Sequence, residues 1–320
     1  MRPADAVQPG VLRRMVRWIG RRLEVVIPLL GVLMFYGMVS SSGIPAQRWQ
    51  VAVVGAVVGA HLGIVLWRPM RVPGKEALQF KGSSILRAAR VVFPTVVAGM
   101  VLLILARTLG KRSSGGTALW GLAAILLTIL FGTLGLGAER SLGVDLLPVF
   151  RRREWTRIVY VLVAAFSFAM VAQLWSGIAK DIAGSIGARA FGEASLDVEG
   201  AASSFDASHP LGVLISLMVG AGLFEELLFR LGILTLVWAL TRRFWVGLVV
   251  SALAFGLYHI TPLSGMDSYL ATPFAAVMTS AAMGIYMGLV YRYRGFAAAA
   301  LVHGLGDWIV VMMYAAMGQF

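Results

Sequence analysis

The chain of 320 residues has a net charge of +13, with 59% of its residues in the hydrophobic classes and only 13% charged. Ordinary soluble domains are about 25% charged, and a soluble protein of this size cannot hide so much apolar surface from water. The composition therefore excludes a soluble globular enzyme and a disordered chain, and it predicts an all-α polytopic membrane protein. Lys and Arg in cytoplasmic loops explain the positive charge better than nucleic-acid binding does. The chain has no cysteine, which excludes disulfides, thiolate metal sites and a Cys nucleophile.

Nine apolar stretches are long enough to be membrane spans, and eight is the alternative count because the shorter ones suit re-entrant segments as well. In chain order they are Val25–Ser41, Val51–Trp67, Val91–Ala106, Ala118–Gly137, Ile158–Ile178, Leu211–Leu240, Phe244–His259, Pro273–Tyr291 and Ala297–Ala316. With the N-terminus in the cytoplasm, 21 of the 28 Lys and Arg residues lie on the inner side and six on the outer side. This asymmetry supports both the count and the cytoplasmic N-terminus.

The spans divide the chain into four regions. Residues 1–24 form a basic cytoplasmic segment, and residues 25–178 hold five transmembrane helices with no assigned role. An outer loop over residues 179–210 precedes a C-terminal region of four helices over residues 211–320. Glycines spaced four residues apart, Gly55, Gly59 and Gly63 in one span and Gly284 and Gly288 in another, predict close packing between helices.

Ionisable residues inside a span are costly and tend to be functional. The last four spans contain six of them: Glu225, Glu226, Arg230, His259, His303 and Asp307. Glu226 and Arg230 are four residues apart, as are His303 and Asp307, so each pair shares one helix face. Glu225 is rotated by about 100° from Glu226, so one glutamate is free to pair with Arg230 while the other faces a cavity. Taken singly, Glu226 and Arg230 suit a buried ion pair, His259 an interfacial histidine, and His303 with Asp307 a hydrogen bond between helices. Taken together, the six residues favour one shared polar site.

A carboxylate and a neutral imidazole in a dry site are able to activate water for hydrolysis. The same groups suit a divalent metal such as zinc, with Glu225, His259, His303 and Asp307 as ligands, and a metal-free glutamate mechanism fits them equally well. Two other classes of function stay open. A proton-coupled transporter or channel would also place carboxylates and histidines in mid-membrane. A non-catalytic immunity or scaffold protein would keep the same residues without using them in a reaction.

The motifs, taken in order, resemble those of the CPBP family, the CAAX proteases and bacteriocin-processing (Abi) enzymes, which includes the type II CAAX prenyl endopeptidases. The resemblance rests on Glu-Glu-x-x-x-Arg at 225–230, Phe-x-x-x-His at 255–259 and His-x-x-x-Asp at 303–307, and covers roughly Leu211–Ala316. It implies an intramembrane endopeptidase for a membrane-embedded or lipidated, CAAX-like substrate, in the plasma (inner) membrane of a prokaryote.

The resemblance also implies catalytic roles for all six residues. Glu225 would activate the water and His259 would help to hold it, while Glu226 and Arg230 would organise the site. His303 and Asp307 would bind a metal or stabilise the oxyanion.

Two features depart from a simple version of this site. Many family members have Asn where this chain has Asp307, and an ionised Asp cannot donate a hydrogen bond to an oxyanion. Asp307 is therefore protonated, or orients His303, or contacts a metal, and the last two alternatives are favoured. In addition, the expected spans place His259 ~22 Å and His303 ~9 Å from the inner ends of their helices. Either one boundary differs from this expectation or a helix is strongly tilted or broken.

Overall fold

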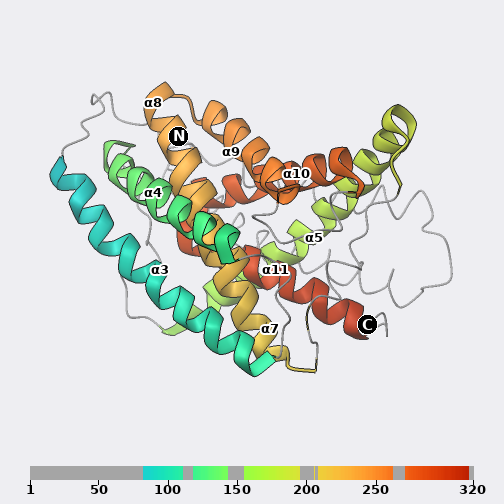
Figure 1. Cartoon of the computed structure of the whole chain (residues 1–320), viewed down its shortest axis with the longest axis horizontal. Helices are drawn as coiled ribbons and strands as arrows, with labels where there is room; N and C mark the ends of the chain where they lie inside the picture. The colour runs from blue at the N-terminus through green and yellow to red at the C-terminus, as the bar shows by residue number, and fades with distance from the viewer. Residues whose placement is uncertain are drawn as a thin grey trace, which may run out of the picture.

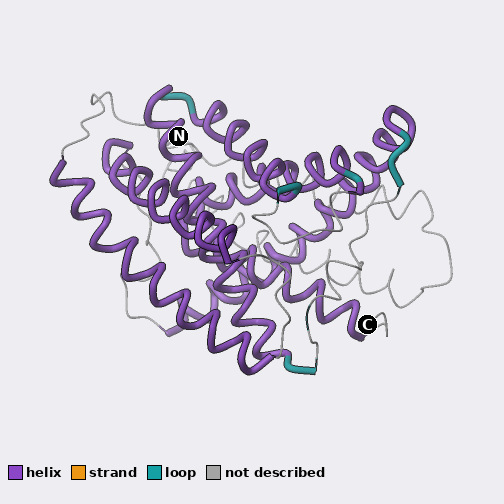
Figure 2. Tube along the Cα trace, viewed as in Figure 1, coloured by secondary structure: helices purple, strands orange, loops and turns teal. Residues whose placement is uncertain are grey.

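The computed structural model describes residues 82–110, 118–142, 155–194, 205, 208–261 and 271–316, and every regular element within these ranges is helical (Figures 1 and 2). The expected all-α class is thus confirmed for the described part of the chain. The first two expected spans, Val25–Ser41 and Val51–Trp67, lie outside the described residues, as do Gly55, Gly59 and Gly63.

The remaining expected spans all fall on helices. The bounds in chain order are α3 Gly82–Gly110, α4 Ala118–Leu142, α5 Trp155–Phe191, α7 Pro210–Leu217, the π-helical segments η1 Met218–Glu225 and η2 Leu227–Leu234, α8 Thr235–Thr241, α9 Phe244–His259, α10 Pro273–Arg294 and α11 Phe296–Ala316. Elements α7 to α8 follow one another without a break, so the expected span Leu211–Leu240 is one helical rod. The expected bounds of α9 are those of the structure.

Local sequence explains where these helices begin and end. Pro210 and Pro273 occupy the first turns of α7 and α10, where a missing backbone N–H costs nothing. Gly295 follows α10 with a φ of 87°, a backbone conformation that favours glycine, and Arg242 ends α8 with a φ of 58°. These two stops place α9 and α11 as separate helices next to the rod.

Four of the described helical segments are long and apolar enough to cross a membrane: Ile85–Leu103, Pro210–Thr241, Pro273–Arg294 and Phe296–Ala316. Leu122–Ala138 and Phe244–His259 are shorter apolar helices. These segments support an integral membrane protein, whereas the count of nine spans and the cytoplasmic N-terminus stay predictions.

Helix α5 is longer than the sequence analysis expected. The expected span ends at Ile178 and is followed by an outer loop, but α5 continues through Lys180 and Asp181 to Phe191. The charges in this stretch mark the end of the apolar segment and not the end of the helix. Beyond it, Glu193 accepts hydrogen bonds from the backbone N–H groups of Phe274 at 2.8 Å and Ala275 at 3.1 Å. Glu193 therefore caps the start of α10 and ties it to the end of α5.

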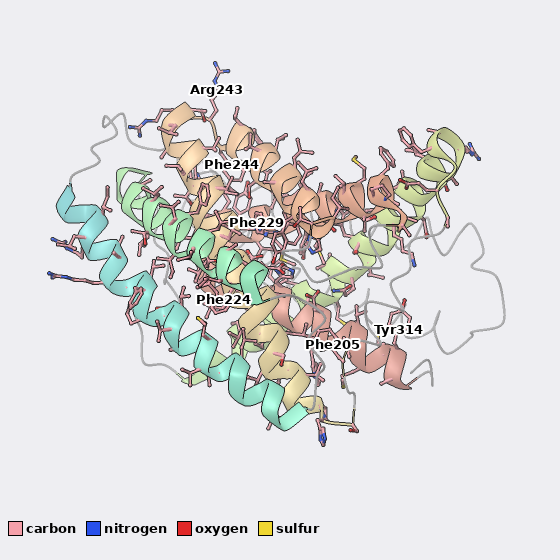
Figure 3. All side chains as sticks on the ribbon, in the orientation of Figure 1. Phe205, Phe224, Phe229, Arg243, Phe244 and Tyr314 are labelled. Carbon is pink, nitrogen blue, oxygen red and sulfur yellow. The ribbon has the colours of Figure 1, made fainter. Side chains whose placement is uncertain are left out.

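The rod from α7 to α8 lies among the other helices, in contact with α3, α4, α9 and α11 (Figure 1). Figure 3 shows Phe229 towards the middle of the bundle and Phe244 near the start of α9. The main core gathers large side chains from the rod, α9 and α10, among them Trp238, Phe255 and Tyr291, each at most 2% exposed. Helix α5 adds hydrogen bonds to α10: Trp175 Nε1 donates to the Ala282 carbonyl at 2.7 Å. The six ionisable residues therefore lie in a closely packed group of helices.

Glycines allow the helices of this group to approach closely, as the spacing of Gly284 and Gly288 predicts. A Cβ atom added to Gly284 would lie 2.9 Å from the Cα of Ala252 on α9, and one added to Gly288 would overlap Leu248. The prediction of close packing is confirmed for this pair. It follows that α9 and α10 are in near backbone contact, which fixes the position of His259 at the end of α9.

Candidate active site

The first part of the site lies where the rod departs from ordinary α-helical geometry. Glu225 is the last residue of η1, Glu226 joins the two π-helical segments, and Arg230 lies within η2. The Thr235 hydroxyl donates to the Arg230 carbonyl five residues earlier, at 2.8 Å, and it also contacts the Tyr291 hydroxyl at 2.7 Å. π-Helical turns inside longer helices are rare and frequently occur at functional sites. The sequence pattern gives no sign of these turns, because the same residues at the same spacing also suit an ordinary α-helix.

Glu226 forms the centre of a buried network of charged groups. Its Oε1 atom lies 3.2 Å from Nη1 of Arg230 and 2.8 Å from Nδ1 of His303. Glu226 and Arg230 are completely buried and His303 is 4% exposed. The ion pair expected between Glu226 and Arg230 is present. In addition, the same carboxylate orients the imidazole of His303, a role that sequence spacing within one helix cannot reveal.

Glu225 has the different environment that its rotation around the helix predicts. Its Oε2 atom lies 3.8 Å from Nε2 of His303, beyond hydrogen-bond distance, and it is buried without a hydrogen-bond partner in the described part of the chain. The side chain is 16% exposed, against 0% for Glu226. Glu225 therefore has an acceptor oxygen free beside an imidazole that is held in place by its neighbour.

Asp307 lies on the same side of His303 as Glu225. Its Oδ2 atom is 3.7 Å from Nε2 of His303, and its side chain, at 32% exposed, is the most accessible of the groups that contact His303. Of the alternatives for Asp307, orientation of His303 has little support in this geometry, because Glu226 makes the short hydrogen bond to that ring. Asp307 instead lies at the accessible edge of the site.

His259 joins the site through the ring of Phe255. Its Nδ1 atom lies 2.8 Å from the Phe255 carbonyl, and because a carbonyl only accepts, Nδ1 carries a proton. The Phe255 ring is 4.5 Å from the His259 ring and 5.6 Å from the His303 ring, measured between centroids. It also lies 4.4 Å from Cζ of Arg230. The Phe255 ring thus contacts His259, His303 and Arg230. The Phe-x-x-x-His motif alone does not predict these contacts.

The two histidines meet around this ring although the expected depths of His259 and His303 differ. The bounds of α9 are those expected, and α11 begins one residue before the expected start, so an error in the helix boundaries does not explain the difference. The remaining explanations are a strongly tilted helix or a broken one.

Two glycines bring the glutamates to His303. A Cβ atom on Gly222 of η1 would lie 2.6 Å from the Ala300 carbonyl oxygen of α11. One on Gly304 would lie 2.8 Å from the Cα of Met218 and 2.7 Å from its sulfur atom. Since the obstructing atoms include backbone, a larger residue at either position would push η1 and α11 apart. These glycines flank the contact between Glu226 and His303 and allow it to form.

The possible metal ligands do not form a preformed site. Among the residues that the structure describes, no three His, Asp or Glu side chains are grouped to hold a metal ion. The arrangement gives a physical reason: Nδ1 of His303 is engaged by Glu226, and His259 is joined to the group through Phe255. A metal site built from Glu225, His259, His303 and Asp307 stays a prediction.

Comparison with known proteins gives one match. Residues 207–309 match the family model described as Rce1-like, Type II CAAX prenyl endopeptidase Rce1-like. No curated protein and no solved structure gives a significant match to the chain. The matched residues include the whole rod from α7 to α8, the helices α9 and α10, and α11 as far as Ile309.

The match agrees with the resemblance that the three motifs carry, and the same residues form the buried network around His303. The region over residues 207–309, which contains all six ionisable residues of the candidate site, is thereby assigned to the CAAX-protease family of Rce1-like membrane endopeptidases.

Proposed function

We propose that the protein hydrolyses a peptide bond in a membrane-associated or lipidated, CAAX-like substrate, with a water molecule activated by Glu225. The observation that carries this proposal is the pair of neighbouring glutamates with different environments. Oε2 of each glutamate has no hydrogen-bond partner among the described residues, but Glu226 is fully buried and its Oε1 contacts Arg230 and His303, whereas Glu225 is 16% exposed and lies 3.8 Å from the His303 ring. An acceptor of this kind is suited to bind and deprotonate water.

The proposed reaction uses the groups already described. Glu225 takes a proton from water as the water oxygen attacks the carbonyl carbon of the scissile bond, and the carbonyl electron pair moves to its oxygen. When the tetrahedral intermediate collapses, the C–N bond breaks and Glu225 returns the proton to the departing amine. With the Nδ1 proton of His259 donated to the Phe255 carbonyl, Nε2 of the neutral ring is the atom that would accept a hydrogen bond from the water.

The network around Glu226 would keep this arrangement in place. Arg230 neutralises the Glu226 carboxylate, and Glu226 fixes the orientation of His303 beside Glu225. A site held in this way needs no rearrangement when charge develops in the transition state. We place the enzyme in the plasma membrane of a prokaryote, in line with its apolar helices and with the resemblance stated above.

The test is a cleavage assay with purified protein in detergent and two fluorogenic peptides, one carrying a prenylated CAAX sequence and one carrying a transmembrane segment. The wild type should cleave at least one of them, and Glu225→Gln should lower kcat by about 10² to 10⁴, the usual contribution of a general base. Asp181→Asn, which removes an exposed carboxylate on α5, is the matched control. Cleavage by Glu225→Gln at the wild-type rate would refute the proposal, and proton-coupled flux in liposomes without any cleavage would favour a transporter.

A further inference from the structure

One polar side chain from outside the family-matched region lies against the site. Helix α5 packs along α11, and a Cβ atom on Gly306 would lie 2.8 Å from Nε2 of Gln173 and 3.9 Å from the Cβ of Ala169. Gly306 belongs to the same helical turn as His303 and Asp307. The amide of Gln173 therefore lies against the turn of α11 that carries two of the candidate catalytic residues.

Hydrolysis of a peptide bond places negative charge on the carbonyl oxygen, and a site for this reaction needs hydrogen-bond donors directed at that oxygen. The two groups nearest to Nε2 of His303 are the carboxylates of Glu225 and Asp307, at 3.8 and 3.7 Å. An ionised carboxylate accepts hydrogen bonds and does not donate them. In the proposed reaction Glu225 takes up the proton of the attacking water and returns it to the departing amine, and an ionised Asp307 would repel the developing charge. Neither carboxyl group is therefore a dedicated donor to the oxyanion.

The strongest donor of the site, Arg230, is fully buried against other groups. Its Nη1 atom lies 3.2 Å from Glu226 and its guanidinium lies against the face of Phe255 at 4.4 Å, so its N–H groups are closed off from the accessible edge of the site although they have no hydrogen-bond partner among the described residues. In contrast, Gln173 is only partly buried, is uncharged, and carries two N–H donors on a flexible side chain. It has the N–H donors that the carboxylates lack, and it comes from α5, which packs against the turn of α11 that carries His303 and Asp307.

We propose that Gln173 is a further catalytic residue, whose side-chain amide donates a hydrogen bond to the oxyanion formed on the substrate carbonyl. This inference rests on the proposed peptidase function. It also assigns a role in the chemistry to α5, which precedes the region that the family model matches.

The first experiment measures kcat and KM of the purified protein on the peptide substrates. Gln173→Glu keeps the size of the side chain and replaces the donor by a carboxylate, and Gln173→Ala removes the group. Both should lower kcat by about 10² to 10³, the usual effect of losing one oxyanion donor, with KM little changed. Gly177→Ala, one turn along α5, adds a methyl group where no atom lies within 4 Å, and it should leave both constants unchanged.

The second experiment uses Gly306 to displace the same amide. In Gly306→Ala the new methyl group would meet Nε2 of Gln173, the movable end of a flexible side chain, so the helix should fold while the amide shifts. We expect kcat to fall. The double variant Gln173→Ala with Gly306→Ala should have the kcat of Gln173→Ala alone, within about twofold, because the methyl group acts only through the amide.

The results separate this inference from the function on which it rests. If the wild type cleaves neither peptide, the proposed function fails. If the wild type cleaves and Gln173→Glu has the wild-type kcat, the role of Gln173 is refuted. The role is equally refuted if the effects of Gln173→Ala and Gly306→Ala on kcat multiply, since the methyl group would then act by another route.

Discussion

Nδ1 of His303 and Oε1 of Glu226 lie 2.8 Å apart, although 76 residues separate the two side chains along the chain and both are shielded from solvent. The same Glu226 oxygen is 3.2 Å from Arg230. A buried carboxylate that contacts two partners orients both. Its removal leaves the Arg230 charge without a counter-ion and His303 without a hydrogen-bond acceptor in a region of low dielectric. The contact therefore links the stability of the bundle to the geometry of the site.

The first prediction separates the two neighbouring glutamates by stability. Glu226→Gln removes the carboxylate that forms the ion pair with Arg230, and breaking a buried pair typically costs about 3–5 kcal/mol. Glu225→Gln removes no ion pair of Arg230 and should leave the midpoint of thermal unfolding in detergent near that of the wild type. Both variants should be inactive. Equal midpoints for the two variants would contradict the assignment of Glu226 as the structural partner.

The second prediction concerns replacement of the whole ion pair. Arg230→Met alone should destabilise the protein, because the Glu226 charge is then buried with only His303 beside it. Glu226→Leu combined with Arg230→Met should recover much of the lost stability, since apolar groups of similar volume often replace a buried pair without cost. The double variant should nevertheless stay inactive, because His303 has lost the carboxylate that orients it. Thermal unfolding and cleavage rate, measured on the same preparations, test both parts, and an active double variant would show that this orientation is not needed.

The third prediction concerns the close approach of η1 and α11. Gly222→Ala places a methyl group 2.6 Å from the Ala300 carbonyl oxygen, so the two helices must separate. We expect a loss of about 1–3 kcal/mol in stability, as for other overpacked positions, together with a strong loss of activity. Gly220→Ala lies two residues away in the same segment and meets no atom within 4 Å, so it should behave as the wild type. A fully active Gly222→Ala variant would show that the glycine contact does not position the glutamates.

The fourth prediction addresses Asp307 and the metal. Because Glu226 holds Nδ1 of His303 and Asp307 is 3.7 Å from Nε2, the imidazole should keep its orientation in Asp307→Asn. This variant should therefore keep substantial activity, and its added amide provides another donor near the oxyanion. Metal content measured by mass spectrometry, alongside kcat/KM, completes the test. Loss of both activity and a bound metal in Asp307→Asn would instead identify Asp307 as a metal ligand.

The sequence by itself predicted the described helices and singled out six ionisable residues that the structure places near one another. Apolar stretches long enough to span a membrane predict helices because backbone groups in lipid must be paired within the segment, and the expected bounds of α9 and α10 lie within a few residues of the structure. Charged residues are costly in such segments, so the six that remain stand out against an apolar background. Helix α5 extends beyond the expected span Ile158–Ile178 to Phe191, since charge marks the limit of an apolar segment and a helix is able to continue beyond it.

Only the tertiary structure decided which partner each of these residues has. The π-helical turns around Glu226 and the position of the Phe255 ring beside both His259 and His303 are not encoded in residue spacing within one helix, and neither is the close contact through Gly222. They arise from packing between helices that are distant in the chain. For the same reason Gln173 had no signal in the sequence: an isolated glutamine on α5 acquires its meaning from the turn of α11 against which it lies. Local composition determined which groups are buried, and long-range packing determined how they are paired.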